Sequence, residues 1–166
     1  FSGTVRENIR YGRLDATDEE IYEASRMVSA DVVASRMEDG YDTDVGEGGD
    51  KLSTGEKQLI SFARAVLANP PIFVLDEATS SIDTETEQLI QNAISHILKG
   101  RTSFLVAHRL STIRHADLIL VVQAGKIIER GTHAELMSQK GYYYNLYTAM
   151  RVEQASETVL KEGSTS

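Results

Sequence analysis

Three short apolar runs, separated by helix-forming segments, most constrain what this chain can fold into. They are Ile72–Leu75, Ser103–Val106 and Leu118–Val122. Runs that are apolar on both faces and alternate with helices are typical of a buried, mostly parallel sheet. Lys126–Arg130 follows the third run after a turn at Gly125, which predicts a hairpin at the sheet edge. The sequence therefore predicts an α/β fold with helices flanking the sheet.

Helix starts are marked by four Ser/Thr-x-x-Glu sequences. In such a capping box, the hydroxyl and the carboxylate each accept a hydrogen bond from a backbone amide that the first helical turn leaves free. Pro70 and Pro71 end the helix that follows the second box, because proline cannot continue a helix. The four boxes are Thr17–Glu20, Ser53–Glu56, Thr84–Glu87 and Thr132–Glu135.

The 166 residues fit one domain, which divides into three parts by pattern. Residues 1–71 are predicted to form helices and glycine-rich loops, and residues 72–150 to hold the strands. Residues 151–166 are predicted to form a flexible, solvated tail. Phe1 opens the chain without a methionine or a signal-peptide pattern, so we expect a segment of a longer protein.

Composition excludes several classes of function. A formal net charge of −8 argues against a general nucleic-acid binder, which normally carries a basic face. The chain has no cysteine, which rules out a disulfide scaffold, a cysteine nucleophile and a thiolate zinc site. No apolar run approaches the ~18 residues that a membrane-spanning helix needs.

Acidic and imidazole side chains follow two of the apolar runs. Asp76 and Glu77 directly follow the first run, and His108 follows the second. In open α/β sheets, ligands bind outside the carboxyl ends of the strands. A carboxylate pair at that place can hold Mg²⁺ and polarise a water. The alternative is an acidic pair that caps the next helix, beside a histidine with a structural role.

Leu52–Glu56 follows the glycine-rich stretch Gly46–Gly49 and opens a long helix. A helix N-terminus presents free amides and about half a positive charge, so this segment suits an anion. A capping box after a flexible loop fits equally well. The segment by itself does not separate the two interpretations.

The combination and order of four motifs separate them. Leu-Ser-x-Gly-x begins at Leu52, and Val-Leu-Asp-Glu-Ala-Thr-Ser begins at Val74. Ser-Ile-Asp begins at Ser81, and Val-Ala-His-Arg-Leu-Ser-Thr begins at Val106. Together they closely resemble the nucleotide-binding domain of ATP-binding cassette (ABC) transporters of the exporter type, over about residues 1–150. The resemblance implies an incomplete P-loop NTPase of ABC type, with a helical subdomain, a signature helix and part of the ATPase core.

The resemblance also implies a role for the residues after the strands. Asp76 resembles the Walker B aspartate, which supports Mg²⁺, generally through water. Glu77 matches the catalytic glutamate, which orients or deprotonates the attacking water. His108 matches the switch histidine that senses the γ-phosphate.

A second set of residues would act across a dimer. The signature segment of the family contacts the γ-phosphate of an ATP held by the opposite subunit. Asp83 lies in a segment that resembles the D-loop, which couples the two sites of the dimer. The signature residues in this chain are Leu52, Ser53, Thr54, Gly55 and Glu56.

The resemblance extends to partners. Thr43–Glu47 is similar to the loop that exporters place against the transmembrane domains, and Phe1–Ile9 resembles the segment just after the Q-loop. The implied protein is an exporter ATPase that uses ATP and Mg²⁺ and pairs with a second nucleotide-binding domain and with transmembrane domains. It would lie at the cytoplasmic face of the cell membrane and have no nucleic-acid partner.

Two features bear on the activity of the chain by itself. No G-x-x-x-x-G-K-[ST] phosphate loop occurs in these residues. We therefore expect the chain alone to bind ATP weakly or not at all and to be inactive. Further strands of the same sheet would also lie outside these residues, so we expect Ile72–Leu75 to be partly uncovered.

The signature departs from the usual pattern at two positions, because Thr54 and Glu56 stand where the family has glycine and glutamine. We expect Thr54 to keep an ordinary backbone, since a left-handed one would cost about 1–2 kcal/mol. A carboxylate ~4 Å from a phosphate would be repelled by about 4 kcal/mol at an effective dielectric constant of ~20. Glu56 is therefore expected to turn back to the amide of Ser53.

Two alternative functions stay open at this point. A nucleic-acid-associated soluble ABC ATPase would share the signature and Walker B motifs, and a non-catalytic orphan fragment would keep them as relics. The acidic balance and the Thr43–Glu47 loop favour the exporter. The gene sequence upstream of Phe1 distinguishes all three.

Overall fold

The computed structural model describes residues 1–76, 82–106 and 110–163. These residues form two compact units. The first unit contains residues 1–75 and 82–104, and the second contains Asp76, residues 105–106 and residues 110–163. The two units are described separately.

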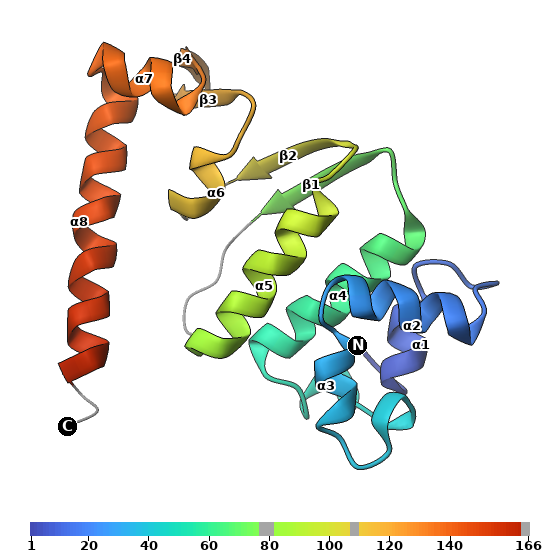
Figure 1. The fold of residues 1–166 in the computed structure, drawn as a ribbon. Coiled ribbons are helices and arrows are strands. Elements are labelled where there is room, and N and C mark those ends of the chain that lie inside the picture. Colours follow the sequence, from blue (N-terminus) through green and yellow to red (C-terminus); the bar gives the residue numbers. More distant parts are fainter. Residues whose placement is uncertain (77–81, 107–109, 164–166) are drawn as a thin grey trace. The chain divides into compact units, whose positions relative to one another are not determined.

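The first unit consists mainly of helices around one long helix, α4 (Thr54–Ala68) (Figure 1). Helices α1, α2 and α5 all pack against α4. The unit also holds a pair of short strands, except for their last residues, Asp76 and residues 105–106, which are grouped with the second unit. Its remaining elements are α1 (Val5–Arg10), α2 (Asp18–Met27), α3 (Asp31–Ser35), η1 (Gly40–Asp42), η2 (Glu47–Gly49), β1 (Ile72–Asp76), α5 (Thr84–Ile97) and β2 (Thr102–Val106).

The core of this unit lies between α4 and the helices around it. Each helix turns an apolar side inward, as its sequence period predicts. At the crossing of the chain over α4, a Cβ on Gly12 would lie 2.2 Å from the carbonyl oxygen of Arg64, so only glycine fits there. The largest fully buried side chains of this unit are Val5, Ile9, Ile21, Val28, Val33, Val45, Leu59, Ile60, Ile90 and Ile97.

Three of the four predicted capping boxes are confirmed, at Thr17–Glu20, Ser53–Glu56 and Thr132–Glu135. The fourth prediction, Thr84–Glu87, is wrong. Asp83 caps α5 instead, and its carboxylate accepts a hydrogen bond from the amide of Thr86 at 2.9 Å. Asp is preferred over Thr at the N-cap, in agreement with Asp83 at this position. The sequence analysis also missed a box at Thr4–Glu7, which opens α1.

Strands β1 and β2 pair with each other, and α5 connects them. Figure 1 shows both arrows pointing the same way, in agreement with the predicted parallel sheet. In the part of the chain that the structure describes, β1 is buried on one face only. Phe73 and Leu75 are buried, whereas Val74 between them is 68% exposed. The expectation that Ile72–Leu75 is partly uncovered is confirmed, because only one face of β1 meets other residues of the unit.

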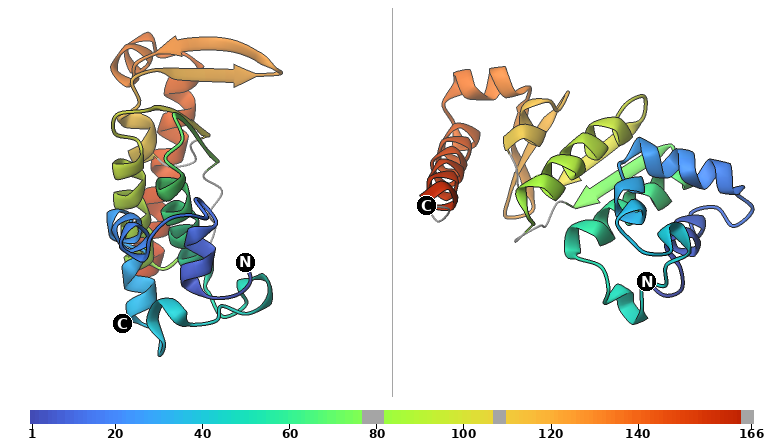
Figure 2. Two further views of the ribbon diagram at one scale, coloured as in Figure 1. Left: turned by 90° about the vertical axis from the view of Figure 1, so that its right-hand side faces the viewer. Right: turned by 60° about the horizontal axis from the view of Figure 1, so that its bottom comes forward.

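The second unit contains a β-hairpin and three helices. Strands β3 (Ile119–Gln123) and β4 (Lys126–Gly131) are antiparallel, as the left view of Figure 2 shows clearly. Ala124 and Gly125 both have positive φ, of 47° and 74°, which matches the two-residue turn that hairpins prefer. The predicted hairpin is confirmed, although β3 pairs with β4 in a separate two-stranded sheet rather than with β1 or β2.

The helices of the second unit are α6 (Leu110–Arg114), α7 (His133–Gln139) and α8 (Tyr142–Gly163). Val121, Leu136 and Tyr143 form its core. The carboxylate of Glu129 accepts hydrogen bonds from the amides of Tyr142 and Tyr143, at 2.6 and 2.8 Å, and so caps the start of α8. Where the sequence predicts a flexible tail from residue 151, α8 continues as a helix through Gly163.

Candidate functional site

The start of α4 is closed by two reciprocal hydrogen bonds. The amide of Ser53 donates to the Glu56 carboxylate at 2.8 Å, and the amide of Glu56 donates to the Ser53 hydroxyl at 3.3 Å. Glu56 thus turns back as the sequence predicts. Thr54 is the first helical residue and does not have a positive φ, so its expected ordinary backbone is also confirmed.

Two amides at this helix start precede the intrahelical hydrogen bonds. The first such bond runs from Lys57 N to Ser53 O at 3.0 Å, and the Ser53 hydroxyl takes the amide of Glu56. The amides of Thr54 and Gly55 therefore have no hydrogen-bond acceptor within the helix. They carry the positive end of the helix dipole, which favours an anion at this place.

Asp83 lies at the start of α5, the next helix along the chain. Its side chain is exposed, and the hydrogen bonds that it accepts from Thr86 lower the pKa of its carboxyl from the usual value. Helices α4 and α5 pack against each other, with Gly55 of α4 beside Thr86 of α5. The structure thus brings the predicted signature residues and Asp83 to neighbouring helix starts.

The predicted membrane-facing loop is tied to the beginning of the chain. The amide of Val45 donates to the carbonyl of Gly3 at 2.9 Å, and the amide of Val5 donates to the carbonyl of Thr43 at 3.1 Å. The amide of Lys51 in turn donates to the carbonyl of Val45 at 3.3 Å. A run of backbone hydrogen bonds therefore leads from the first residues through this loop to the start of α4.

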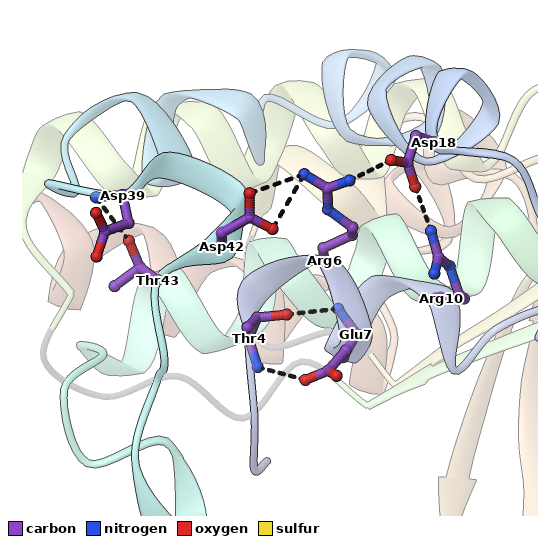
Figure 3. Close-up of polar contacts among 8 residues, drawn as sticks. All are labelled: Thr4, Arg6, Glu7, Arg10, Asp18, Asp39, Asp42 and Thr43. Atoms are coloured by element: carbon purple, nitrogen blue, oxygen red, sulfur yellow. Dashed lines mark hydrogen bonds and ion pairs between the residues drawn. The ribbon is translucent and has the colours of Figure 1, made fainter.

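A polar cluster supports the same region from the side (Figure 3). The guanidinium groups of Arg6 and Arg10 in α1 both pair with the carboxylate of Asp18, the first residue of α2. Arg6 also contacts Asp42 of η1 at 3.0 Å. The Thr43 hydroxyl accepts from the amide of Asp39 at 3.2 Å. These contacts fix α1, α2 and η1 together just before the loop begins.

The residues predicted for chemistry after the strands are only partly described. Asp76 is the last residue of β1 and is exposed. Glu77 and His108 lie outside the described residues. Within residues 1–76, 82–106 and 110–163, no group of three or more His, Cys, Asp or Glu side chains could together hold a metal ion.

Known proteins resemble this chain consistently. A domain family described as "ABC transporter" matches residues 2–80. The fatty acid ABC transporter ATP-binding/permease protein of Mycobacterium tuberculosis is 54% identical over 149 residues, which are 90% of this chain and 24% of that protein. A putative multidrug export ATP-binding/permease protein of Staphylococcus aureus is 54% identical over 148 residues, 89% of this chain and 26% of that protein. The chain belongs to the ABC transporter family.

A solved structure carries the same likeness into three dimensions. The structure of a bacterial Atm1-family ABC exporter with ATP bound superposes with a TM-score of 0.78 at 42% sequence identity. The match covers 93% of this chain and 26% of the exporter chain. The ABC segment described here thus spans about a quarter of the length of these relatives. Its fold is that of part of an ABC-type P-loop NTPase.

The carboxylate of Asp76, at the carboxyl end of β1, is one oxygen ligand of the kind that a hard metal ion prefers. Mg²⁺ usually keeps several waters and takes one or two carboxylates together with phosphate oxygens. A single exposed carboxylate therefore fits this metal, and a closed cage of protein ligands is not needed.

The sequence analysis missed two residues that shape this site. Thr86 forms a hydrogen bond with Asp83 and contacts Gly55. The prediction of a capping box at Thr84 led to this residue being overlooked, although Asp83, directly before Thr84, is a residue type that caps helices. Arg64 of α4 donates to the backbone carbonyl of Asn8 at 2.8 Å. No local sequence pattern predicts that contact, because the two residues are 56 positions apart in the chain.

Proposed function

We propose that this segment acts in the ATPase of an ABC exporter, where the start of α4 contacts the γ-phosphate of an ATP held by a second nucleotide-binding domain. The capping box at Ser53 and Glu56 is the observation that carries the proposal. The first intrahelical hydrogen bond leaves the amides of Thr54 and Gly55 without an acceptor in the helix, and the Glu56 carboxylate is held in a hydrogen bond from the Ser53 amide.

The helix start supplies electrostatic attraction. The free amides and the helix dipole together attract a polyanion, and they attract most strongly the part of the ligand that carries the most negative charge. Glu56 opposes this attraction, but its hydrogen bond to Ser53 directs the carboxylate to the backbone of its own chain. The segment can therefore bind phosphate despite carrying Glu where the family usually has Gln.

Asp76, Glu77 and His108 would complete the reaction centre in this proposal. Asp76 would hold Mg²⁺, which supplies neutralisation of phosphate charge when bound. Glu77 would orient or deprotonate the attacking water. His108 would contact the γ-phosphate.

Two kinds of partner follow from the proposal. A second nucleotide-binding domain, identical or homologous, would provide the nucleotide that faces α4. Transmembrane domains would meet the Thr43–Glu47 loop, which places the segment at the cytoplasmic face of the cell membrane. Among the described residues, no helix combines the length and the apolar character that crossing a membrane requires.

The decisive experiment uses the full-length transporter that contains this segment, purified in lipid. Glu77→Gln should lower the rate of ATP hydrolysis about 10²- to 10⁴-fold, which is the usual contribution of a general base. Glu38→Gln, which makes the same substitution at an exposed carboxylate of the first unit, serves as the matched control and should leave turnover unchanged. Equal turnover in Glu77→Gln and wild type would remove Glu77 from the proposed role.

A second measurement concerns the segment alone. Residues 1–166 contain no G-x-x-x-x-G-K-[ST] loop, and we propose that they bind ATP weakly or not at all in isolation. Titration calorimetry with Mg²⁺-ATP should therefore show no saturation in the micromolar range. Saturable micromolar binding would contradict this part of the proposal.

A further inference from the structure

Gly55 is required by the space around it. A Cβ at this position would lie 2.3 Å from Cγ2 of Thr86 and 3.2 Å from Cγ2 of Ile82. The backbone of Gly55 does not have a positive φ, so conformational freedom does not explain the glycine. The side chain of Thr86 occupies the place where any other residue at position 55 would put its first carbon.

Thr86 also binds Asp83. Its amide donates to the Asp83 carboxylate at 2.9 Å, and its hydroxyl forms a second hydrogen bond to the same carboxylate. The side chain of Thr86 is buried, with 5% exposure. The methyl group of Thr86 thus packs against α4, and its hydroxyl is hydrogen-bonded to Asp83, the residue that caps α5.

The apolar side of α5 does not by itself call for a threonine. Ile90, Ala93 and Ile94 continue that side, and a valine at position 86 would have the same shape as threonine. What the hydroxyl adds is the bond to Asp83, and what the γ-methyl adds is the contact with Gly55. The two groups of Thr86 therefore join Asp83 to the start of α4.

We propose that Thr86 is a positioning residue that couples the phosphate-contacting start of α4 to Asp83, so that both move as one body when two nucleotide-binding domains close. This inference rests on the proposed function of α4. Thr86 itself does not touch nucleotide. It acts by holding Gly55 and Asp83 in fixed relation.

A double-mutant cycle in the full-length transporter tests the coupling. Gly55→Ala should lower kcat about 10- to 100-fold, because a misplacement of about 1 Å at a reacting centre can cost that much. Thr86→Ser removes the methyl group and keeps the hydroxyl. The double variant Gly55→Ala/Thr86→Ser should regain kcat to within about threefold of Thr86→Ser alone.

A second arm isolates the hydroxyl. Thr86→Val keeps the shape and loses the bond to Asp83, and it should lower kcat about tenfold while equilibrium ATP binding, followed with a fluorescent ATP analogue, changes less than about twofold. The thermal midpoint is recorded alongside, because a purely structural role would lower that midpoint and leave kcat per folded site unchanged. Thr84→Ser, at an exposed threonine two residues earlier in the same helix, is the control.

The outcomes separate the two proposals. Failure of Thr86→Ser to restore the Gly55→Ala variant, or a Thr86→Val variant with wild-type kcat, would overturn the coupling. Should Gly55→Ala fail to fold, the Thr86→Val measurement decides by itself. Wild-type turnover in Glu77→Gln would instead count against the proposed function and leave the contact between Gly55 and Thr86 as packing alone.

Discussion

The carboxylate of Glu56 accepts a hydrogen bond from the amide of Ser53 at 2.8 Å, at the helix start that we propose to face ATP. A negative charge is thus held in place within the first turn of α4. The same bond stabilises the helix, because acidic groups favour a helix N-terminus. The segment combines a strong cap with a charge that its proposed ligand would repel.

Replacing this charge should favour closure. In the full-length transporter, Glu56→Gln should lower the ATP concentration for half-maximal closure of the two nucleotide-binding domains about two- to fivefold, because a screened repulsion is removed. A glutamine can still accept the Ser53 amide. Closure is followed by distance measurements between spin labels, with Glu38→Gln as the control. Weaker closure in Glu56→Gln would contradict the electrostatic argument.

Arg64 should contribute strongly to stability. Its guanidinium lies over the rings of Phe1 and Tyr11, 5.2 and 5.3 Å from their centres, and desolvation lowers its pKa. It also bonds Asn8 through two nitrogens, at 2.8 and 3.2 Å. Lysine cannot reproduce this fork, so Arg64→Lys should destabilise the fold by about 2 kcal/mol.

Thermal unfolding of the full-length transporter measures this difference. Arg13→Lys provides the comparison, because Arg13 makes an ion pair with Glu20 in which both side chains are over 40% exposed. Such a pair contributes about 0–1 kcal/mol. Equal thermal midpoints for the two variants would show that the stacking and the bonds to Asn8 contribute little.

The uncovered strand face should cause association of the isolated segment. Ile72 and Val74 of β1 and Phe104 of β2 are each more than half exposed, and exposed apolar strands promote aggregation. Residues 1–166 alone should therefore form oligomers in light scattering after size exclusion, and Val74→Lys should reduce their fraction. Leu14→Lys, which replaces an exposed apolar residue in the first unit's loop, should not. A monomeric wild-type segment at high concentration would refute the prediction.

Tyr143 should make the second unit sensitive to alkaline pH. Burial raises the pKa of its hydroxyl to about 12 from an ordinary value of 10. The folded state therefore keeps the proton that the unfolded state loses, so this contribution to stability is fully present below pH ~10 and is lost as pH rises towards 12.

Absorbance titration of residues 1–166 at the tyrosinate band tests the assignment. One tyrosine should ionise near pH 12, and Tyr143→Phe should remove that step. Tyr144→Phe on the same helix is the control. A Tyr143→Phe titration curve that keeps the late step would assign it to another tyrosine.

Local patterns predicted the parts of this fold that depend on local chemistry. The box at Ser53–Glu56 and the turn at Gly125 were predicted because a few neighbouring side chains satisfy nearby amides or permit a positive φ. The cap of α5 was predicted one residue too late, because Asp83 and Thr84 are adjacent residues that can both cap a helix and the Ser/Thr-x-x-Glu pattern pointed to Thr84.

Features that depend on distant residues could not be predicted in this way. An apolar run such as Ile72–Leu75 predicts a strand, but the number of its faces that are covered depends on which other elements reach it. The contact of Arg64 with Asn8 depends on how α1 crosses α4. Glu77 and His108 were assigned only from the sequence motifs in which they lie, and their roles stay predictions.

The two backbone hydrogen bonds of Val45 limit which sequence changes this part of the chain can accept. Its amide bonds Gly3 and its carbonyl accepts from Lys51, and its side chain is fully buried. Both hydrogen bonds belong to the backbone, so exchanging one side chain for another of similar size leaves them intact. Adding or deleting a single residue between positions 45 and 51 would shift one bond relative to the other. The length of this stretch is therefore more tightly constrained than its composition.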